Sequence, residues 1–135
     1  MIGVLILAQD AIGKGLVESA THILGAQPPR LEALAVDDAR CSPEELTSQI
    51  RNSLGRLDEG DGTLILADIY GASHTNTACR LLEKGRVELV SGVNLPMLVR
   101  VLNHRNLSLA QLVDKATSGG AEGIVCASQR MKSRQ

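Results

Sequence analysis

The chain has 135 residues, a length typical of one domain with a single core. Its 14 basic and 15 acidic residues form no basic stripe, and it has no Phe or Trp, which excludes a nucleic-acid-binding surface as its main feature. Hydrophobic residues make up 44% of the chain, so the core must be aliphatic, as in buried parallel strands covered by helices.

Strand patterns alternate with helix patterns along the chain. The first half predicts a strand at residues 2–8, a helix at 12–24, a strand at 31–36, a helix at 43–57 and a strand at 63–67. The second half predicts a helix at 76–84, a strand at 87–91, helices at 96–103 and 108–117, and a strand at 122–127. Gly25 ends the first helix, Ser42 begins the second with a capping box to Glu45, and Gly119-Gly120 predicts a break.

Repeated strand–helix units predict an α/β fold with a mainly parallel, flavodoxin-like sheet and helices on both faces. Residues 1–128 are predicted to form one domain and residues 129–135 a polar tail. Functional groups in such sheets lie beyond the carboxyl ends of the strands, where the strand order reverses between the first and third strands.

Two loops meet at that point of the predicted sheet. They bring together five polar residues: Gln9, Asp10, Asp68, Ser73 and His74. The helices that follow these loops direct backbone N–H groups to the same place, which suits an anion such as phosphate.

No metal or other cofactor is predicted. Cys41, Cys79 and Cys126 have no metal-ligand spacing, and their odd number suggests reduced thiols in a cytoplasmic protein. The N-terminal apolar run is too short to span a membrane and lacks the basic residues that precede a signal peptide.

Three segments carry a family resemblance: ESATHILG, LADIYGASHTNTACRLL and SGVNLPMLVRVL. The chain resembles the IIA component of the mannose/fructose family in the bacterial phosphoenolpyruvate-dependent sugar phosphotransferase system. The resemblance implies a four-stranded parallel sheet, a homodimer that exchanges an antiparallel edge strand (residues 124–127), and possible peripheral association with a membrane sugar transporter. It also implies phosphoryl transfer from HPr to a histidine at the end of strand one, and then to a IIB partner.

The strand-one corner departs from the family pattern. Family members have Thr-His-Gly there, whereas this chain has Ala8-Gln9-Asp10. An amide cannot accept a phosphoryl group as an imidazole does, and the Asp10 charge repels phosphate. Asp68 and Ser73 match the family's supporting residues, and His74 replaces a residue that is usually proline.

Each of these residues also has a structural interpretation. Gln9, Asp68 and Ser73 can serve as turn or cap residues, and His74 can be an exposed loop histidine rather than a relocated phosphoryl acceptor. His22 and His104 lie far from the corner in the topology and are given no role.

Three functions remain open. The chain is a IIA-type relay protein with impaired phosphorylation, a non-catalytic regulatory dimer derived from the family, or an aspartyl-phosphate receiver that uses Asp10 and Asp68. The receiver is disfavoured because the last predicted strand is followed by no lysine that would enter the pocket.

Overall fold

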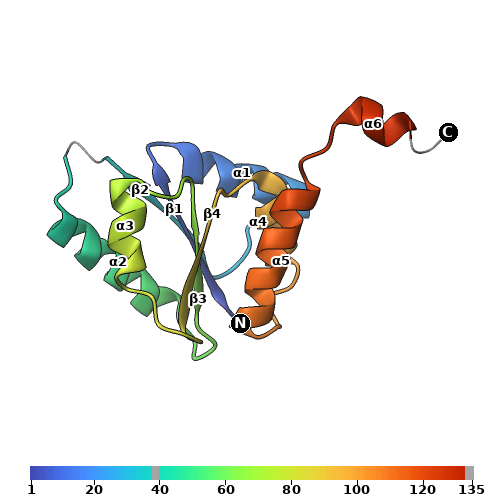
Figure 1. Cartoon of the computed structure of the whole chain (residues 1–135). Helices are drawn as coiled ribbons and strands as arrows, with labels where there is room; N and C mark the ends of the chain where they lie inside the picture. Colours follow the sequence, from blue (N-terminus) through green and yellow to red (C-terminus); the bar gives the residue numbers. More distant parts are fainter. Residues whose placement is uncertain (38–39, 133–135) are drawn as a thin grey trace.

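The computed structural model describes residues 1–37 and 40–132 (Figure 1). The strands are β1 (Gly3–Gln9), β2 (Leu31–Val36), β3 (Thr63–Ala67) and β4 (Val87–Ser91). The helices are α1 (Ile12–Leu24), α2 (Pro43–Leu57), α3 (Ser73–Cys79), α4 (Leu95–Leu102), α5 (Leu109–Glu122) and α6 (Ala127–Lys132). All strand pairs are parallel and their order is β2-β1-β3-β4, so the predicted reversal between the first and third strands is confirmed.

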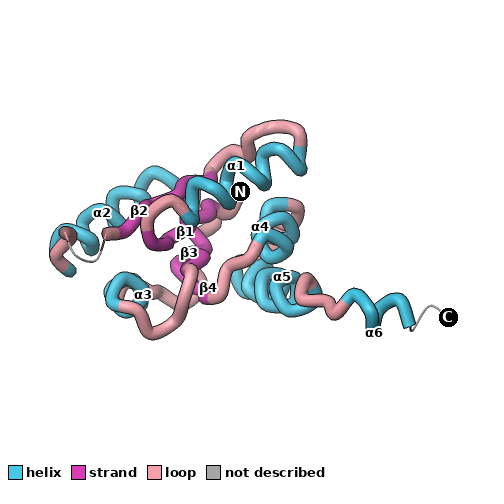
Figure 2. The backbone as a smooth tube through the Cα atoms, turned by 90° about the horizontal axis from the view of Figure 1, so that it is seen from above, coloured by secondary structure: helices cyan, strands magenta, loops and turns pink. Residues whose placement is uncertain are grey.

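The sheet lies between two layers of helices (Figure 2). One face, with Leu5 and Leu7 of β1, packs against α2 and α3, and the other, with Val4 and Ile6, packs against α1, α4 and α5. The central strand β1 is buried on both faces, which explains its continuous apolar run. Within the described residues, no helix combines the length and apolarity needed to cross a bilayer.

The predicted caps at Ser42 and Gly25 are confirmed, but only the Ser42 half of the predicted capping box forms in α2, and the complete capping box is that of Ser108 and Gln111 at the start of α5. Ser42 accepts the backbone N–H of Glu45 at 3.2 Å, and α1 ends at Gly25 in the left-handed conformation. The helix predicted at residues 76–84 is misplaced, because α3 begins at Ser73 and ends at Cys79. A tight turn follows, with the N–H of Leu81 bonded to the carbonyl of Ala78, and directs Leu81 against the core.

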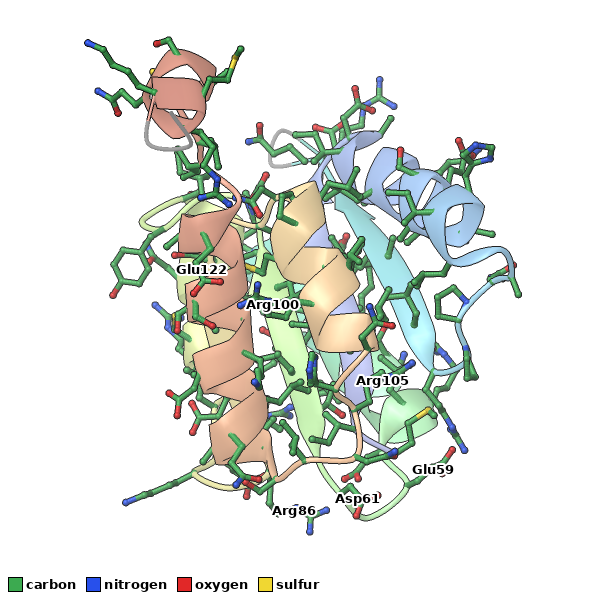
Figure 3. The ribbon with its side chains drawn as sticks, turned by 90° about the vertical axis from the view of Figure 1, so that its right-hand side faces the viewer. Glu59, Asp61, Arg86, Arg100, Arg105 and Glu122 are labelled. Atoms are coloured by element: carbon green, nitrogen blue, oxygen red, sulfur yellow. The ribbon has the colours of Figure 1, made fainter. Side chains whose placement is uncertain are left out.

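The predicted break at residues 118–120 is wrong, because α5 continues through both glycines to Glu122. These glycines allow α4 to approach closely. A Cβ on Gly119 would lie 2.9 Å from the Cβ of Arg100, and one on Gly120 would lie 2.9 Å from Cε of Met97. Arg100 also pairs with Glu122 at 2.7 Å, which ties the end of α5 to α4 (Figure 3).

The predicted antiparallel strand at the C-terminus is not seen in this chain, where residues 124–126 form an irregular segment and α6 begins at Ala127. This segment leads away from the body of the domain (Figure 1). Ile124 and Val125 are 78% and 49% exposed, so their apolar character does not reflect burial in this chain. A strand needs a neighbouring backbone, and in the described part of the chain β3 is the one strand that pairs with β4. The last three residues of the predicted tail lie outside the described residues.

Gly119→Ala should lower the free energy of unfolding by about 1–3 kcal/mol, because the added methyl group overpacks the α4–α5 contact. Gly15 of α1 is a matched control, since a Cβ there meets nothing within 4 Å. Gly15→Ala should be neutral or stabilising by up to about 1 kcal/mol, through helix propensity alone. Urea denaturation of both variants measures the difference, and equal effects would show that the α4–α5 contact tolerates a methyl group.

Candidate functional site

The loops that follow β1 and β3 meet at one edge of the sheet, as the topology predicts. The backbone N–H of Gln9 donates to Oδ2 of Asp68 at 2.9 Å, which joins the two loops directly. Asp10 is exposed, has a left-handed φ of 51°, and donates its N–H to the carbonyl of Val36 at 3.1 Å. The corner therefore exposes the Gln9 and Asp10 residues while their backbone is held by β2 and Asp68.

Asp68 is the centre of the hydrogen-bond network at this corner. Its side chain is only 12% exposed. Its Oδ1 accepts the N–H of Ile69 at 2.9 Å and Nε2 of His74 at 2.6 Å, and its Oδ2 accepts Gln9. Burial raises the pKa of Asp68, but the hydrogen bonds from His74 and the two backbone N–H groups lower it more, so the pKa lies below its ordinary value. Asp68 is therefore ionised at neutral pH.

His74 is completely buried, so its interpretation as an exposed loop histidine is wrong. It is the second residue of α3, and its Nε2 points to the carboxylate that ends β3. Because a carboxylate only accepts hydrogen bonds, Nε2 must carry a proton in this pair. The structure thus places an imidazole against Asp68, and this imidazole comes from α3 rather than from the end of β1.

The other residues of the loop after β3 hold its shape. Ser73 is exposed at the start of α3, and its carbonyl accepts Oγ1 of Thr77 at 3.0 Å. Thr75, which the sequence interpretation missed, is fully buried and donates from Oγ1 to the carbonyl of Ile69 at 2.6 Å. The continuous run of polar residues from Ser73 to Thr77 hides this, because a buried threonine that bonds to the backbone has no sequence pattern of its own.

The site holds no recognisable metal ligand set. Among the described residues, no three His, Cys, Asp or Glu side chains are grouped so as to bind a metal ion. His22 and His104 lie outside the corner, and His104 bonds through Nδ1 to the carbonyl of Arg100 at 2.7 Å. Neither helix that follows the two loops has a side-chain cap, because Ala11 and Ala72 are the N-cap residues of α1 and α3.

Acid should remove the stabilising effect of Asp68. Because its pKa is lowered in the folded state, Asp68 stabilises the fold at pH values above its ordinary pKa of 3.8, and this stabilisation is lost as the pH falls through the folded value. At neutral pH we expect Asp68→Asn to lower the free energy of unfolding by about 1–3 kcal/mol. The difference from the wild type should shrink below about pH 4. Urea denaturation of both proteins across this pH range tests the prediction. A difference in the free energy of unfolding that stays constant with pH would contradict it.

Comparisons with known proteins identify relatives of this chain. The mannose-specific EIIAB component of the phosphotransferase system of Escherichia coli K12 is 38% identical over 84 residues, which cover 60% of this chain and 26% of that protein. The transcriptional regulatory protein LevR of Bacillus subtilis is 29% identical over 123 residues, 86% of this chain and 12% of that protein. The chain therefore spans about a quarter or less of the length of these curated relatives.

The structural similarity is more extensive. The crystal structure of the phosphotransferase system component EIIA from Streptococcus agalactiae superposes with a TM-score of 0.84 and 25% identity, covering 96% of this chain and 99% of that one. The model of the family described as "PTS system fructose IIA component" (EIIA-man) matches residues 3–117. With this match over most of its length, the chain belongs to the mannose/fructose IIA family of the phosphotransferase system.

Proposed function

We propose that this IIA-family protein works in the phosphoryl relay for sugar uptake or its regulation, with phosphorylation at the usual position impaired. The observation that carries the proposal is Gln9 at the end of β1, joined through its backbone to Asp68. In the family this corner holds the histidine that accepts the phosphoryl group. The amide nitrogen of Gln9 has its lone pair delocalised into the carbonyl, so it is not a nucleophile at neutral pH.

The surroundings of Gln9 support the same conclusion. In a phosphorylatable site, Asp68 would orient the imidazole and stabilise its cationic form. Here its Oδ1 already accepts His74 and Ile69, and the Asp10 carboxylate adds negative charge at the exposed corner. An incoming phosphoryl group would therefore meet an amide and two carboxylates rather than an imidazole.

His74 is the second candidate acceptor. Its pairing with Asp68 at 2.6 Å is the kind of contact that would orient a nucleophilic imidazole. However, Nε2 donates to Asp68 and the side chain is 0% exposed, so a donor protein could reach His74 only after the residues that cover it moved. We therefore assign His74 a role in holding Asp68 and the loop, and leave phosphorylation of His74 as an outcome of the test.

The partners proposed for this chain are those of the family: HPr, a IIB component and a membrane sugar transporter at which it associates peripherally in the cytoplasm. Exposed apolar side chains at the start of α1 and in the loop after β3 suit a protein partner, namely Ile12, Ile69 and Tyr70, which are 50%, 58% and 73% exposed. The exposed Ile124 and Val125 suit a homodimer in which this segment pairs with the free edge of a second subunit's β4. A purely regulatory dimer is the alternative.

The deciding experiment incubates the purified chain with phosphoenolpyruvate, the first enzyme of the system and HPr. The protein is then analysed for acid-labile phosphate by mass spectrometry under neutral conditions. We expect no phosphate on the wild type while a family member that retains the histidine becomes labelled in parallel. Phosphate on His74, abolished by His74→Ala, would instead establish a relocated acceptor, and rapid phosphorylation of any other residue would refute the proposal.

A further inference from the structure

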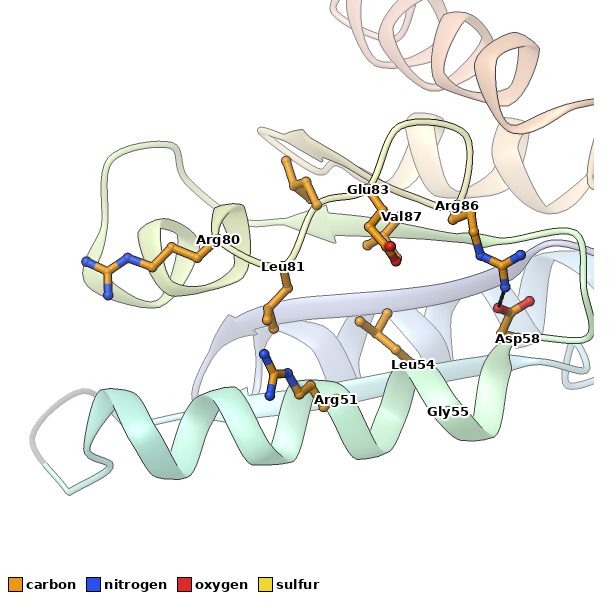
Figure 4. Close-up of a pocket in the computed structure, with 10 residues that line it drawn as sticks. Arg51, Leu54, Gly55, Asp58, Arg80, Leu81, Glu83, Arg86 and Val87 are labelled. Carbon is orange, nitrogen blue, oxygen red and sulfur yellow. Dashed lines mark hydrogen bonds and ion pairs between the residues drawn. The ribbon is translucent and has the colours of Figure 1, made fainter.

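A groove of about 530 Å³ lies far from the corner, between α2 and the segment of residues 80–87 that joins α3 to β4 (Figure 4). It reaches Val87, the first residue of β4, and Asp58, which follows α2. The groove therefore opens toward the amino ends of the strands, whereas Gln9 and Asp68 follow the carboxyl ends of β1 and β3.

One wall of the groove is a single face of α2. Its lining residues follow the helical repeat at positions i, i+3, i+4 and i+7: Arg51, Leu54, Gly55 and Asp58. The opposite wall is apolar near the sheet, where Leu81 and Val87 pack against the core. Leu82 also lines the groove and is 37% exposed, so the groove offers apolar surface to an occupant.

Two arginines of the groove lack partners. Arg86 is neutralised by Asp58, whose carboxylate lies 2.7 Å away. The pKa of Asp58 is lowered, chiefly by the backbone N–H of Gly60, so this pair stays charged at neutral pH. Arg51 and Arg80 are exposed, and their guanidinium groups make no hydrogen bond or ion pair to any described residue. Glu83 is the remaining carboxylate among the lining residues, so the unpaired charge of the groove is positive.

Gly55 leaves this wall of the groove open. It belongs to the last turn of α2 without a left-handed φ, so no backbone conformation requires glycine there. A Cβ at this position would meet nothing within 4 Å, so the packing of the chain does not require glycine either. Glycine is unfavourable in a helix, and its presence at an unfilled position of the groove allows another backbone to approach α2 closely.

We propose that this groove docks an extended acidic segment of a partner protein, with carboxylates paired to Arg51 and Arg80 and apolar side chains on Leu81 and Leu82. Figure 4 shows Arg80 and Arg86 at opposite ends of the groove with Arg51 between them. The cations are thus spread along the groove rather than directed at one point, which favours a chain of charges over a single small anion. Nucleic acid is disfavoured because Asp58 and Glu83 lie in the same groove and no aromatic side chain lines it.

This surface is independent of phosphorylation at the corner. A partner held here would leave Gln9 and Asp68 accessible, since they lie beyond the other end of the strands. The chain would then carry two protein contacts at once, one at each end of the sheet.

Fluorescence anisotropy with a labelled peptide of alternating glutamate and leucine tests the proposal on the full chain. We expect saturable binding that weakens with salt and is lost when glutamine replaces glutamate in the peptide. Arg51→Glu with Arg80→Glu should weaken binding by about tenfold or more. Lys115→Glu is the charge control, because Lys115 lies on α5, which covers the opposite face of the sheet. This variant should change the affinity for the peptide by less than about twofold.

Gly55 supplies a second measurement that does not depend on charge. Gly55→Leu should weaken peptide binding strongly while circular dichroism shows an intact fold, and Gly55→Ala should raise the melting temperature. The proposal is overturned by the absence of saturable binding, or by equal effects of the arginine and Lys115 variants. It is also overturned if inorganic phosphate alone shifts the amide resonances of Arg51 and Arg80 as the peptide does, because the groove would then be a small-anion site.

Discussion

Gln9→His combined with Asp10→Gly should restore phosphorylation by phosphorylated HPr. The variant returns an imidazole to the end of β1 beside Asp68, whose Oδ2 already accepts the N–H of residue 9. It also removes the exposed carboxylate, and glycine adopts the left-handed φ of 51° at this position without strain. Because a nucleophile replaces an inert amide, we expect the rate of label incorporation to rise on the order of a thousandfold or more.

Two further variants separate the roles of the neighbours. Adding Asp68→Asn to the restored protein should remove much of the gain, because the new imidazole loses the carboxylate that orients it. Adding His74→Ala should leave the label on residue 9, although its rate should fall because His74 holds Asp68 in place. A restored protein that folds but takes no label would show that the surface for HPr has diverged as well.

Arg105→Ala should cause the largest loss of stability, about 3–5 kcal/mol in the free energy of unfolding. The guanidinium is buried and donates to the carbonyls of Ile2 at 2.9 Å, Arg30 at 2.6 Å and Pro29. Burial lowers the pKa of Arg105 to about 10, so it remains charged at neutral pH. Its removal leaves three carbonyls at the start of β1 and β2 without this donor.

Arg86→Ala is the matched control for Arg105→Ala. Arg86 forms an ion pair with Asp58, but its side chain is 56% exposed, so its removal should lower the free energy of unfolding by less than about 1 kcal/mol. Figure 3 shows both arginines on the same side of the molecule, and urea denaturation at neutral pH compares them. Equal losses would mean that the contacts of Arg105 are replaced by water.

The sequence predicts the elements whose signals are local. β2, β3 and β4 lie within their apolar runs, and α2 begins at Ser42-Pro43, because burial of a strand and capping of a helix each follow from a few adjacent residues. The reversal of strand order follows from the expectation of helices on both faces, because right-handed strand–helix–strand connections place helices on opposite faces only where the chain changes direction across the sheet.

The errors occur where a distant partner decides the structure. Gly119-Gly120 resembles a helix break, yet both residues are helical. Glycine is present there because α4 occupies the space that a side chain would fill. Residues 124–127 have a strand composition, but the described chain offers them no neighbouring strand. In both cases the same residues would adopt another structure beside other neighbours.

At the candidate site, the sequence by itself places Gln9, Asp68 and His74 in two loops that must meet, because the ends of neighbouring parallel strands share an edge. Only the tertiary structure buries His74 and directs its Nε2 to Asp68 at 2.6 Å. The same holds for Arg105, whose acceptors Ile2 and Arg30 lie 103 and 75 residues away in the chain. Local sequence patterns predict the topology, whereas the burial of a polar side chain depends on where its distant partners lie in the folded chain.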